Sequence, residues 1–322
     1  MERTKEVVDR ILKGEVKAAA RLMRDLDDGV PQGLEVLKYL YPYSGRAHVI
    51  GITGSPGVGK STLTDRMIQV LRQEGKTVGV VAVDPTSPFS GGAILGDRIR
   101  MQRHALDEGV FIRSLATRGH FGGLTASARA VISVLDAMGK DYILAETVGV
   151  GQDEVEIAAT AYTTVVVTVP GLGDDIQAIK AGILEVADIL VVNKADREGA
   201  ERTYQDLRQM LDLKTARRPG DWQTRIYLTK AKENEGIAEL MAAVREHREF
   251  LSRDEGRGLK AARRVRLRQE ILELVQEGIF FQLLEQMTRD GRLDALLEDV
   301  LEKRTDPYTA GETLIAETLG RG

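Results

Sequence analysis

The sequence predicts an α/β fold in which a mainly parallel central sheet is flanked by helices, with helical extensions at both ends. Two observations lead to this prediction: short apolar runs rich in β-branched residues recur along the chain, and segments with apolar residues at helical spacing lie between them. Strands of a parallel sheet are covered on both faces, so they appear in sequence as continuous apolar runs. The predicted strands are residues 49–53, 77–83, 110–112, 142–145, 164–169, 189–192 and 226–228.

Three segments are expected along the chain: an N-terminal helical extension over residues 1–45, an α/β domain over 46–250 and a C-terminal helical arm over 251–322. The first should hold two or three amphipathic helices broken near Gly14 and near residues 29–33. In the last, a basic run precedes helices with a wide apolar face. An interaction arm accounts best for that face, and packing against the N-terminal helices is the alternative.

The composition excludes several classes of function. The 322 residues are 43% hydrophobic and 29% charged, which is ordinary for a globular protein. A net charge of −4 argues against a general binder of nucleic acid or of anionic membranes. There is no cysteine, which excludes disulfides and thiolate metal sites, and the four histidines share no ligand spacing. With a charged N-terminus and no apolar run of about 18 residues, we expect neither a signal peptide nor a membrane span, and a cytoplasmic protein.

A phosphate-binding loop is predicted at residues 54–61, between the first strand and a helix that begins near Lys60. Glycines let the backbone wrap closely around an anion, and the helix N-terminus offers unpaired N–H groups. Lys60 supplies a positive charge and Ser61 a hydroxyl for Mg²⁺. The residues expected to contact the nucleotide phosphates are Gly54, Ser55, Pro56, Gly57, Val58, Gly59, Lys60, Ser61 and Thr62.

A carboxylate and a glycine follow the strand at 142–145, at Glu146 and Gly149. In nucleotide hydrolases of this kind an acid at this point supports Mg²⁺, and the glycine N–H contacts the γ-phosphate. The pattern is weak alone and gains weight from the phosphate loop.

A guanine-specific tetrad follows the strand at 189–192, as Asn193, Lys194, Ala195 and Asp196. The Asp196 carboxylate only accepts hydrogen bonds, so it suits the N1–H and exocyclic amine of guanine, whereas adenine presents an acceptor at N1. Asn193 and Lys194 are expected to hold the loop and to flank the base. The sequence therefore predicts a GTP site.

With these motifs in place, the chain resembles the MeaB/ArgK family of GTPases over nearly its whole length. The resemblance is carried by residues 90–101, 146–152 and 170–183 and by the Asp306-Pro307-Tyr308 triplet. It implies a P-loop NTPase fold of the SIMIBI type and a GTPase that acts as chaperone of a cobalamin-dependent acyl-CoA mutase, methylmalonyl-CoA mutase above all. Such a chaperone gates cofactor loading and protects the mutase, so cobalamin enters only through the partner enzyme. The resemblance also implies a homodimer formed through the C-terminal arm.

Site residues carried over from the family fall into two groups. Catalytic and Mg²⁺-binding roles are implied for Lys60, Ser61, Asp84, Asp97, Arg100 and Glu146, and switch roles that relay the nucleotide state to the partner are implied for Asp174, Gln177 and Lys180. A last guanine contact is implied at Thr229, Lys230 and Ala231. Lys230 stands where the family usually has a small residue, which puts the finer geometry of the base pocket in doubt.

The hydrolysis step leaves alternatives open. Val150 follows Gly149, where many Ras-like enzymes carry the glutamine that orients the attacking water, so slow intrinsic turnover is expected. Either an acid near Asp84 or Asp97 positions the water, or a partner completes the site. The other functions considered are a GTP-dependent metal-insertion factor, a kinase or ATPase of ArgK type, and a nucleotide sensor without turnover.

Overall fold

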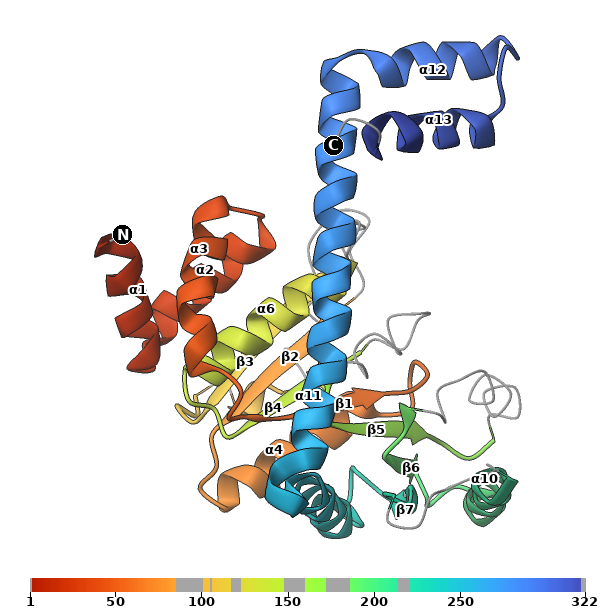
Figure 1. The fold of residues 1–322 in the computed structure, drawn as a ribbon. Coiled ribbons are helices and arrows are strands. Elements are labelled where there is room, and N and C mark those ends of the chain that lie inside the picture. The colour runs from red at the N-terminus through yellow and green to blue at the C-terminus, as the bar shows by residue number, and fades with distance from the viewer. Residues whose placement is uncertain are drawn as a thin grey trace. The chain divides into compact units, whose positions relative to one another are not determined.

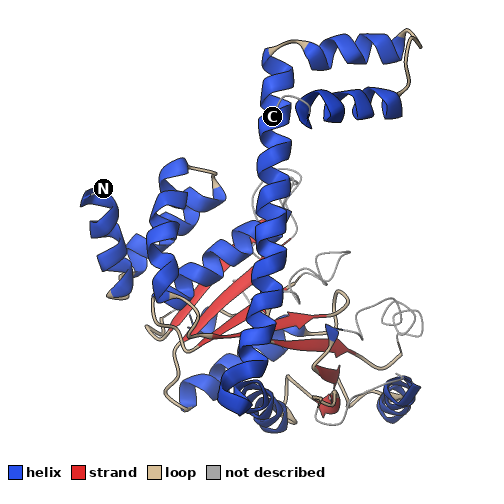
Figure 2. Cartoon of the chain, viewed as in Figure 1, coloured by secondary structure: helices blue, strands red, loops and turns tan. Residues whose placement is uncertain are grey.

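The structure is a computed structural model, and it describes residues 2–84, 101–104, 106–116, 123–147, 160–171, 186–213 and 221–319. The chain divides into two compact units, residues 1–264 and 265–322. The first unit holds a seven-stranded sheet with helices on both of its faces (Figures 1 and 2). This confirms the predicted α/β class.

All seven predicted strands form, and every pair in the sheet is parallel. Their order across the sheet is β3-β2-β4-β1-β5-β6-β7. The strands are β1 His48–Thr53, β2 Val78–Asp84, β3 Val110–Ala116, β4 Tyr142–Glu146, β5 Thr163–Thr168, β6 Ile189–Asn193 and β7 Arg225–Thr229.

The described helices of the first unit are α1 Glu2–Leu12, α2 Val16–Asp27, α3 Pro31–Leu40, α4 Lys60–Gln73, α6 Gly123–Ala137, α10 Ala200–Leu213 and the first part of α11 Ile237–Arg289. Short 3₁₀ turns occupy Tyr41–Tyr43 and Gln102–His104. Helices α1 to α3 confirm the predicted helical prefix, and left-handed glycines separate them at Gly14, with φ +80°, and Gly29, with φ +66°.

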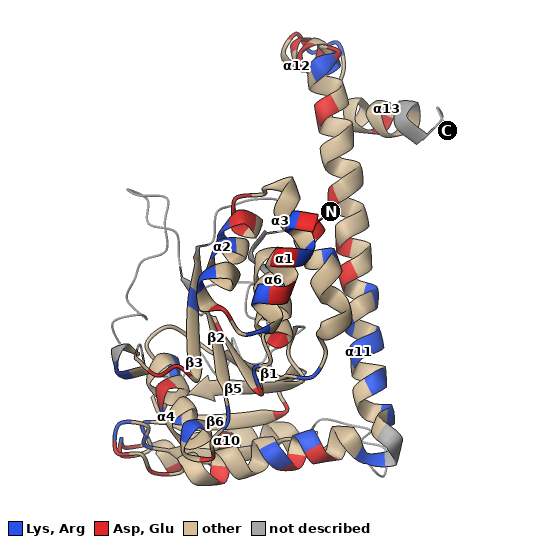
Figure 3. Ribbon diagram, turned by 90° about the vertical axis from the view of Figure 1, so that its left-hand side faces the viewer, with Lys and Arg blue, Asp and Glu red and all other residues tan. Residues whose placement is uncertain are grey.

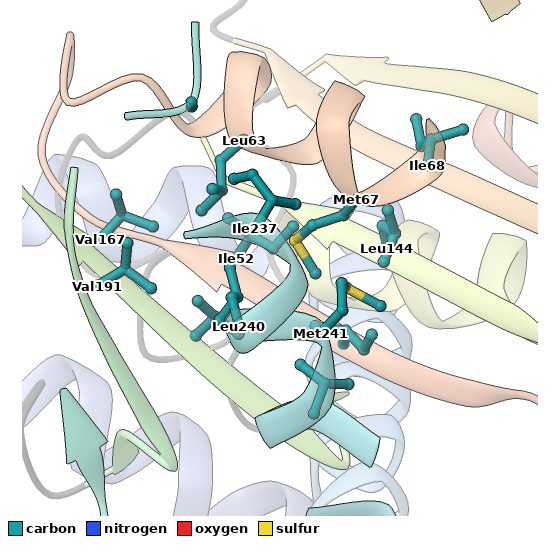
Figure 4. Close-up of a cluster of buried hydrophobic side chains, with 14 of the residues drawn as sticks. Ile52, Leu63, Met67, Ile68, Leu144, Val167, Val191, Ile237, Leu240 and Met241 are labelled. Atoms are coloured by element: carbon teal, nitrogen blue, oxygen red, sulfur yellow. The ribbon is translucent and has the colours of Figure 1, made fainter. Parts of the chain in front are cut away.

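Strands β1, β4, β5 and β6 are buried on both faces because they carry apolar residues at successive positions. In β5, Val165 and Val167 pack with α4 and the start of α11, whereas Val166 packs against α10 on the other face. Figure 4 shows the larger cluster, in which Leu63 and Met67 of α4 lie with Leu240 and Met241 of α11 over the middle strands. This packing fixes the start of α4, and with it the phosphate loop, above the carboxyl end of β1.

The helical prefix is joined to the sheet by a carboxylate cap. Asp136, near the end of α6, accepts hydrogen bonds from the backbone N–H groups of Gly45, Arg46 and Ala47 at 2.5, 3.0 and 2.9 Å. Those three residues connect the prefix to β1. One carboxylate satisfies three successive backbone donors here, of which that of Ala47 is buried, so the start of β1 is held on α6.

A network of buried histidines lies at the amino ends of the strands, at the end of the sheet away from the phosphate loop. The Thr163 hydroxyl lies 2.8 Å from His48 Nε2 and 2.9 Å from His247 Nδ1. His247 Nε2 in turn lies 3.5 Å from Asp188 Oδ1, and its ring packs on Trp222 with centroids 4.6 Å apart. Burial lowers the pKa of His247 to about 4.

We expect this histidine to make the first unit sensitive to acid. A neutral buried imidazole must take up a proton on unfolding below pH 6.5, so the free energy of unfolding should fall as pH drops from about 6.5 to 4, by up to about 3 kcal/mol in total. Above pH 6.5 His247 is neutral in both states and contributes no slope. Urea unfolding at pH 7 and pH 5 measures the difference, and Trp222, the one tryptophan of the chain, reports from beside the ring.

The control for this prediction is His247→Gln, which removes the titrating group. Its free energy of unfolding should change less between pH 7 and pH 5 than that of the unaltered protein. The same acid slope in both proteins would contradict the assignment.

Helix α11 runs for 53 residues and crosses the expected boundary at residues 250 and 251. Gly256 within it has φ +73°, a left-handed conformation that strains any residue with a side chain. Figure 3 shows charged residues of both signs along this helix. In the part of the chain that the structure describes, no helix is both long and apolar enough to cross a membrane.

The second unit holds the end of α11, then α12 Arg292–Leu301 and α13 Pro307–Leu319. Among its described residues, the buried apolar side chains are Met287 and Ala310 alone. Large exposed apolar side chains are Val265, Ile271, Leu272, Leu274, Val275, Ile279, Phe280, Phe281, Leu284, Leu297, Leu301, Tyr308 and Ile315. The unit thus buries little apolar surface by itself.

Candidate functional site

The phosphate loop connects the carboxyl end of β1 to the first residue of α4, as the sequence predicts. Two of its glycines are required by close neighbours. A Cβ at Gly54, whose φ is +137°, would lie 2.0 Å from the carbonyl oxygen of Val167 in β5. A Cβ at Gly59, whose φ is +96°, would lie 2.5 Å from Asn193 Nδ2. Side chains at these two positions would push the loop away from the neighbouring strands.

The Lys60 ammonium lies inside the loop that it follows. Its Nζ donates to the carbonyl oxygens of Gly54 and Ser55 at 2.6 and 3.0 Å, and the residue is buried. A buried ammonium among backbone carbonyls and next to the start of a helix favours a multiply charged anion. Lys60 therefore has the position that its predicted role in binding phosphate requires.

Glu146 is bound to the helix that carries the loop. Ser61 Oγ donates to Glu146 Oε1 at 2.6 Å and Thr64 Oγ1 donates to Oε2 at 2.8 Å, and all three residues are buried. Ile52 of β1 pairs with Glu146 of β4 in the sheet, which places the carboxylate beside the start of the loop. A hydroxyl and a carboxylate are the oxygen donors that Mg²⁺ takes in nucleotide sites, so Ser61 and Glu146 fit this ion.

Asn193 links three segments of the site through one amide group. Its Nδ2 donates to the Val58 carbonyl of the phosphate loop at 2.9 Å. Its Oδ1 accepts from Thr229 Oγ1 and from the backbone N–H of Ala231, both at 3.1 Å. The amide orientation is therefore determined on both sides, and the loop after β6 holds the phosphate loop and the loop after β7 in one arrangement.

Lys194 and Asp196 lie on the open side of the same loop. Lys194 has a left-handed φ of 56° and donates from Nζ to the Gly57 carbonyl at 2.6 Å. Burial, and then the neighbouring Arg197, lower the pKa of Lys194. The Asp196 side chain is exposed. The exposed Asp196 carboxylate can accept hydrogen bonds from the edge of a purine, and the aliphatic part of the Lys194 side chain can pack on its face.

Lys230 is drawn away from the centre of this loop. Its Nζ donates to Glu235 Oε2 at 2.6 Å, and this hydrogen bond is the main cause of its raised pKa. Thr229 and Ala231, on either side of it, are buried against Asn193. The departure at Lys230 therefore places an ion pair at the surface and leaves the backbone of 229–231 close to Asn193.

Several predicted site residues lie outside the described part of the chain: Asp97, Arg100, Gly149, Asp174, Gln177 and Lys180. Asp84 is the last residue of β2, at the same sheet edge as Glu146, because Ala82 pairs with Glu146. The structure thus brings together the phosphate loop, Glu146, the tetrad at 193–196 and the loop at 229–231. The roles of all these residues in binding and catalysis stay predictions.

Sequence reasoning missed three polar residues that hold the site together. Thr64 follows Ser61 by three residues, and this helical spacing is a signal that could have placed both hydroxyls on one face. Thr147 donates to Thr53 at 3.2 Å and tightens the ends of β4 and β1. Arg66 of α4 donates to two carbonyls in the segment after Thr229, a long-range contact for which the sequence has no signal.

Comparison with known proteins agrees with this geometry. The family model for the methylmalonyl-CoA mutase-associated GTPase MeaB matches residues 20–288. A protein of Pyrococcus abyssi that carries a GTPase name is 50% identical over 98% of this chain and 97% of its own length. GTPase ArgK of Escherichia coli is 37% identical over 74% of each chain. A crystal structure described as a LAO/AO transport system kinase is 26% identical, with a TM-score of 0.72, and the match covers 98% of this chain and 97% of that one.

The parallel sheet, the loop at 54–61 and the hydrogen-bonded pair Ser61–Glu146 have the arrangement expected of a P-loop nucleotide hydrolase, and the tetrad at 193–196 has the residues expected of a GTPase. The match with the family model extends beyond these motifs over most of the chain. This chain therefore belongs to the MeaB family of P-loop GTPases.

Proposed function

We propose that the chain is a GTP-hydrolysing chaperone of a cobalamin-dependent acyl-CoA mutase, methylmalonyl-CoA mutase or a relative, and that it gates cofactor loading and protects the mutase. One observation carries this proposal: the matching family is described as mutase-associated, and the match runs through the GTPase unit into the far end of α11. The nucleotide site then serves as a sensor whose output lies in the partner protein.

The chemistry of the site follows from its described residues. Lys60 and the N-terminal N–H groups of α4 bind the β- and γ-phosphates, and Asp196 selects guanine while Asn193 holds the loops around the base. Ser61 and Glu146 would hold Mg²⁺, which supplies charge neutralisation on the phosphates when bound. Water then attacks the γ-phosphorus while the bond from that phosphorus to the β–γ bridging oxygen breaks, and GDP and phosphate leave. We propose that Asp84, Asp97 and Arg100 act around this step, and that turnover by the chain alone is slow.

Transmission to the mutase is proposed for Asp174, Gln177 and Lys180. A segment that contacts the partner in one nucleotide state and releases it in the other would change the affinity for the mutase by the differential binding energy of the two states.

A binding experiment with two purified proteins tests the chaperone role. The chain and a cobalamin-dependent acyl-CoA mutase from the same organism are titrated with GDP, with a non-hydrolysable GTP analogue and without nucleotide. We expect at least about a tenfold difference in affinity between two of these states, which is about 1.4 kcal/mol of coupling. Equal affinity in all three states, or no binding at micromolar concentration, would contradict the chaperone role while leaving the GTPase activity untouched.

We also propose that the second unit forms a homodimer. Its exposed apolar side chains, with Ile271, Leu274 and Phe281 about half exposed, are too many for a stable single copy, because a unit of this size needs buried apolar area to offset its conformational entropy. A second copy of the same surface supplies that cover with closed symmetry.

Sedimentation of the unaltered protein and of an Ile271→Asp, Phe281→Asp variant checks the dimer. We expect a dimer at micromolar concentration and a monomer for the variant, since the introduced charges would be buried in the interface. Leu106→Asp is the matched control, because Leu106 is a 95% exposed apolar residue of the first unit. A monomeric unaltered protein at that concentration would rule out the proposed dimer.

A further inference from the structure

Arg66 connects the helix of the phosphate loop to the loop after β7. Its Nε donates to the Ala231 carbonyl at 3.0 Å, and one of its terminal nitrogens donates to the Lys232 carbonyl at 2.8 Å. The other terminal nitrogen lies 3.2 Å from Gln69 Oε1 on the same helix. One guanidinium thus holds two successive carbonyls of a loop that lies 165 residues further along the chain.

Holding these two carbonyls fixes the orientation of the peptide groups in the loop. A trans peptide is planar, and its C=O and N–H point in opposite directions, so holding the Ala231 carbonyl also sets the direction of the Lys232 N–H. Ala231 itself donates its N–H to Asn193 Oδ1 at 3.1 Å. The loop is therefore held from two sides, by the amide of Asn193 and by the guanidinium of Arg66.

The contact can act on base recognition because of where Arg66 lies. It stands six residues after Lys60 on the same helix. The same helix therefore positions both the lysine that binds phosphate and the arginine that holds the loop near the base. Arginine presents planar donors that can bind two acceptors in one geometry, and lysine presents a single charged point. Hydrogen bonds from a charged donor are also about twice as strong as neutral ones.

We propose that Arg66 is a positioning residue for guanine recognition: by binding the Ala231 and Lys232 carbonyls it orients the Lys232 N–H, which binds the 6-oxygen of the base. This inference rests on the proposed guanine site at 193–196 and 229–231. Arg66 acts through the loop and touches neither phosphate nor Mg²⁺, so it should affect nucleotide affinity and leave the rate of the chemical step unchanged.

The test compares Arg66→Met, which keeps the length of the side chain, with Arg66→Lys and with the control Gln69→Ala. The control removes the third partner of the guanidinium and leaves both loop contacts. We expect GDP to bind about tenfold more weakly to Arg66→Met, with partial recovery in Arg66→Lys and no change in Gln69→Ala. At saturating GTP, kcat should equal that of the unaltered protein. Thermal unfolding confirms that each variant is folded.

Two GDP analogues separate positioning from general loosening. 6-Thio-GDP weakens the acceptor at position 6 alone, and inosine diphosphate lacks only the exocyclic amine that Asp196 is expected to bind. The quantity compared is the loss of affinity for each analogue relative to GDP. In Arg66→Met this loss should shrink several-fold for the thio analogue and stay as in the unaltered protein for the inosine analogue. Asp196→Asn should give the opposite pattern, as in a double-mutant cycle.

The relative affinities for GDP, ADP and the two analogues distinguish a wrong guanine site from a wrong role for Arg66. If the unaltered protein binds GDP no better than ADP, the guanine site itself is wrong, and the inference fails with it. If it prefers GDP and Asp196→Asn weakens binding, but Arg66→Met matches the unaltered protein for all three diphosphates, the site stands and the role of Arg66 is overturned. An equal loss for every analogue, or a fall in kcat at saturation, overturns it as well.

Discussion

Replacing Asp196 by asparagine is expected to turn a guanine site into a xanthine site. The carboxylate accepts from both N1–H and the exocyclic amine of guanine, and an amide can accept only one of them while its NH₂ faces the other donor. Xanthine carries an acceptor in place of that amine, so asparagine complements it. We expect GTP to bind at least about 100-fold more weakly and XTP to become the preferred triphosphate, since hydrogen-bonded sites reject a mismatched ligand by large factors.

Competition binding with GTP, XTP and ATP measures this change. Glu198→Gln is the matched control, because it removes one negative charge from an exposed residue two positions away. That control should leave the order of preference unchanged. Unchanged GTP affinity in Asp196→Asn would show that the tetrad does not hold the base.

Replacing Lys60 by alanine should abolish most of the phosphate affinity. The ammonium is buried within the loop and donates to the carbonyls of Gly54 and Ser55. Its removal leaves bound phosphates without their nearest positive charge and leaves two carbonyls without a donor. Deleting one partner of a buried charge pair costs about 2–5 kcal/mol of binding free energy. We therefore expect the affinity for GTP and GDP to fall by roughly 30-fold to several thousand-fold.

Calorimetric titration with GTP and GDP gives the affinities for this variant. Lys38→Ala is the control, since Lys38 is an exposed lysine paired with Glu35 on α3. Undiminished GTP affinity in Lys60→Ala would contradict the phosphate site, whatever its effect on turnover.

Local patterns predicted the elements of this molecule well, because each strand and the phosphate loop have their own signal. Val49 to Thr53, the glycines at 54 and 59 and the apolar spacing of α4 together dictate a strand, a tight loop and a helix. The helical prefix and its breaks at Gly14 and Gly29 are also confirmed.

The arrangement of these elements could not be read in the same way. That β4 lies between β1 and β2 follows from packing over the whole sheet, and it is this placement that brings Glu146 to Ser61. Asp136 and Arg66 looked like ordinary charged helix residues, and their partners, at Gly45 and Ala231, lie far away in sequence. One helix, α11, continues across residues 250 and 251, where a boundary between segments was expected.

The most direct test of the account is single-turnover hydrolysis by the purified chain, with radiolabelled GTP or ATP and with or without Mg²⁺. The site predicts phosphate release from GTP that is slow, well below 1 s⁻¹, and that requires Mg²⁺. ATP should not react, because the Asp196 carboxylate only accepts hydrogen bonds and N1 of adenine carries no hydrogen to donate. No release from GTP, or equal release from ATP, would contradict the assignment of these residues to a guanine-specific hydrolase site.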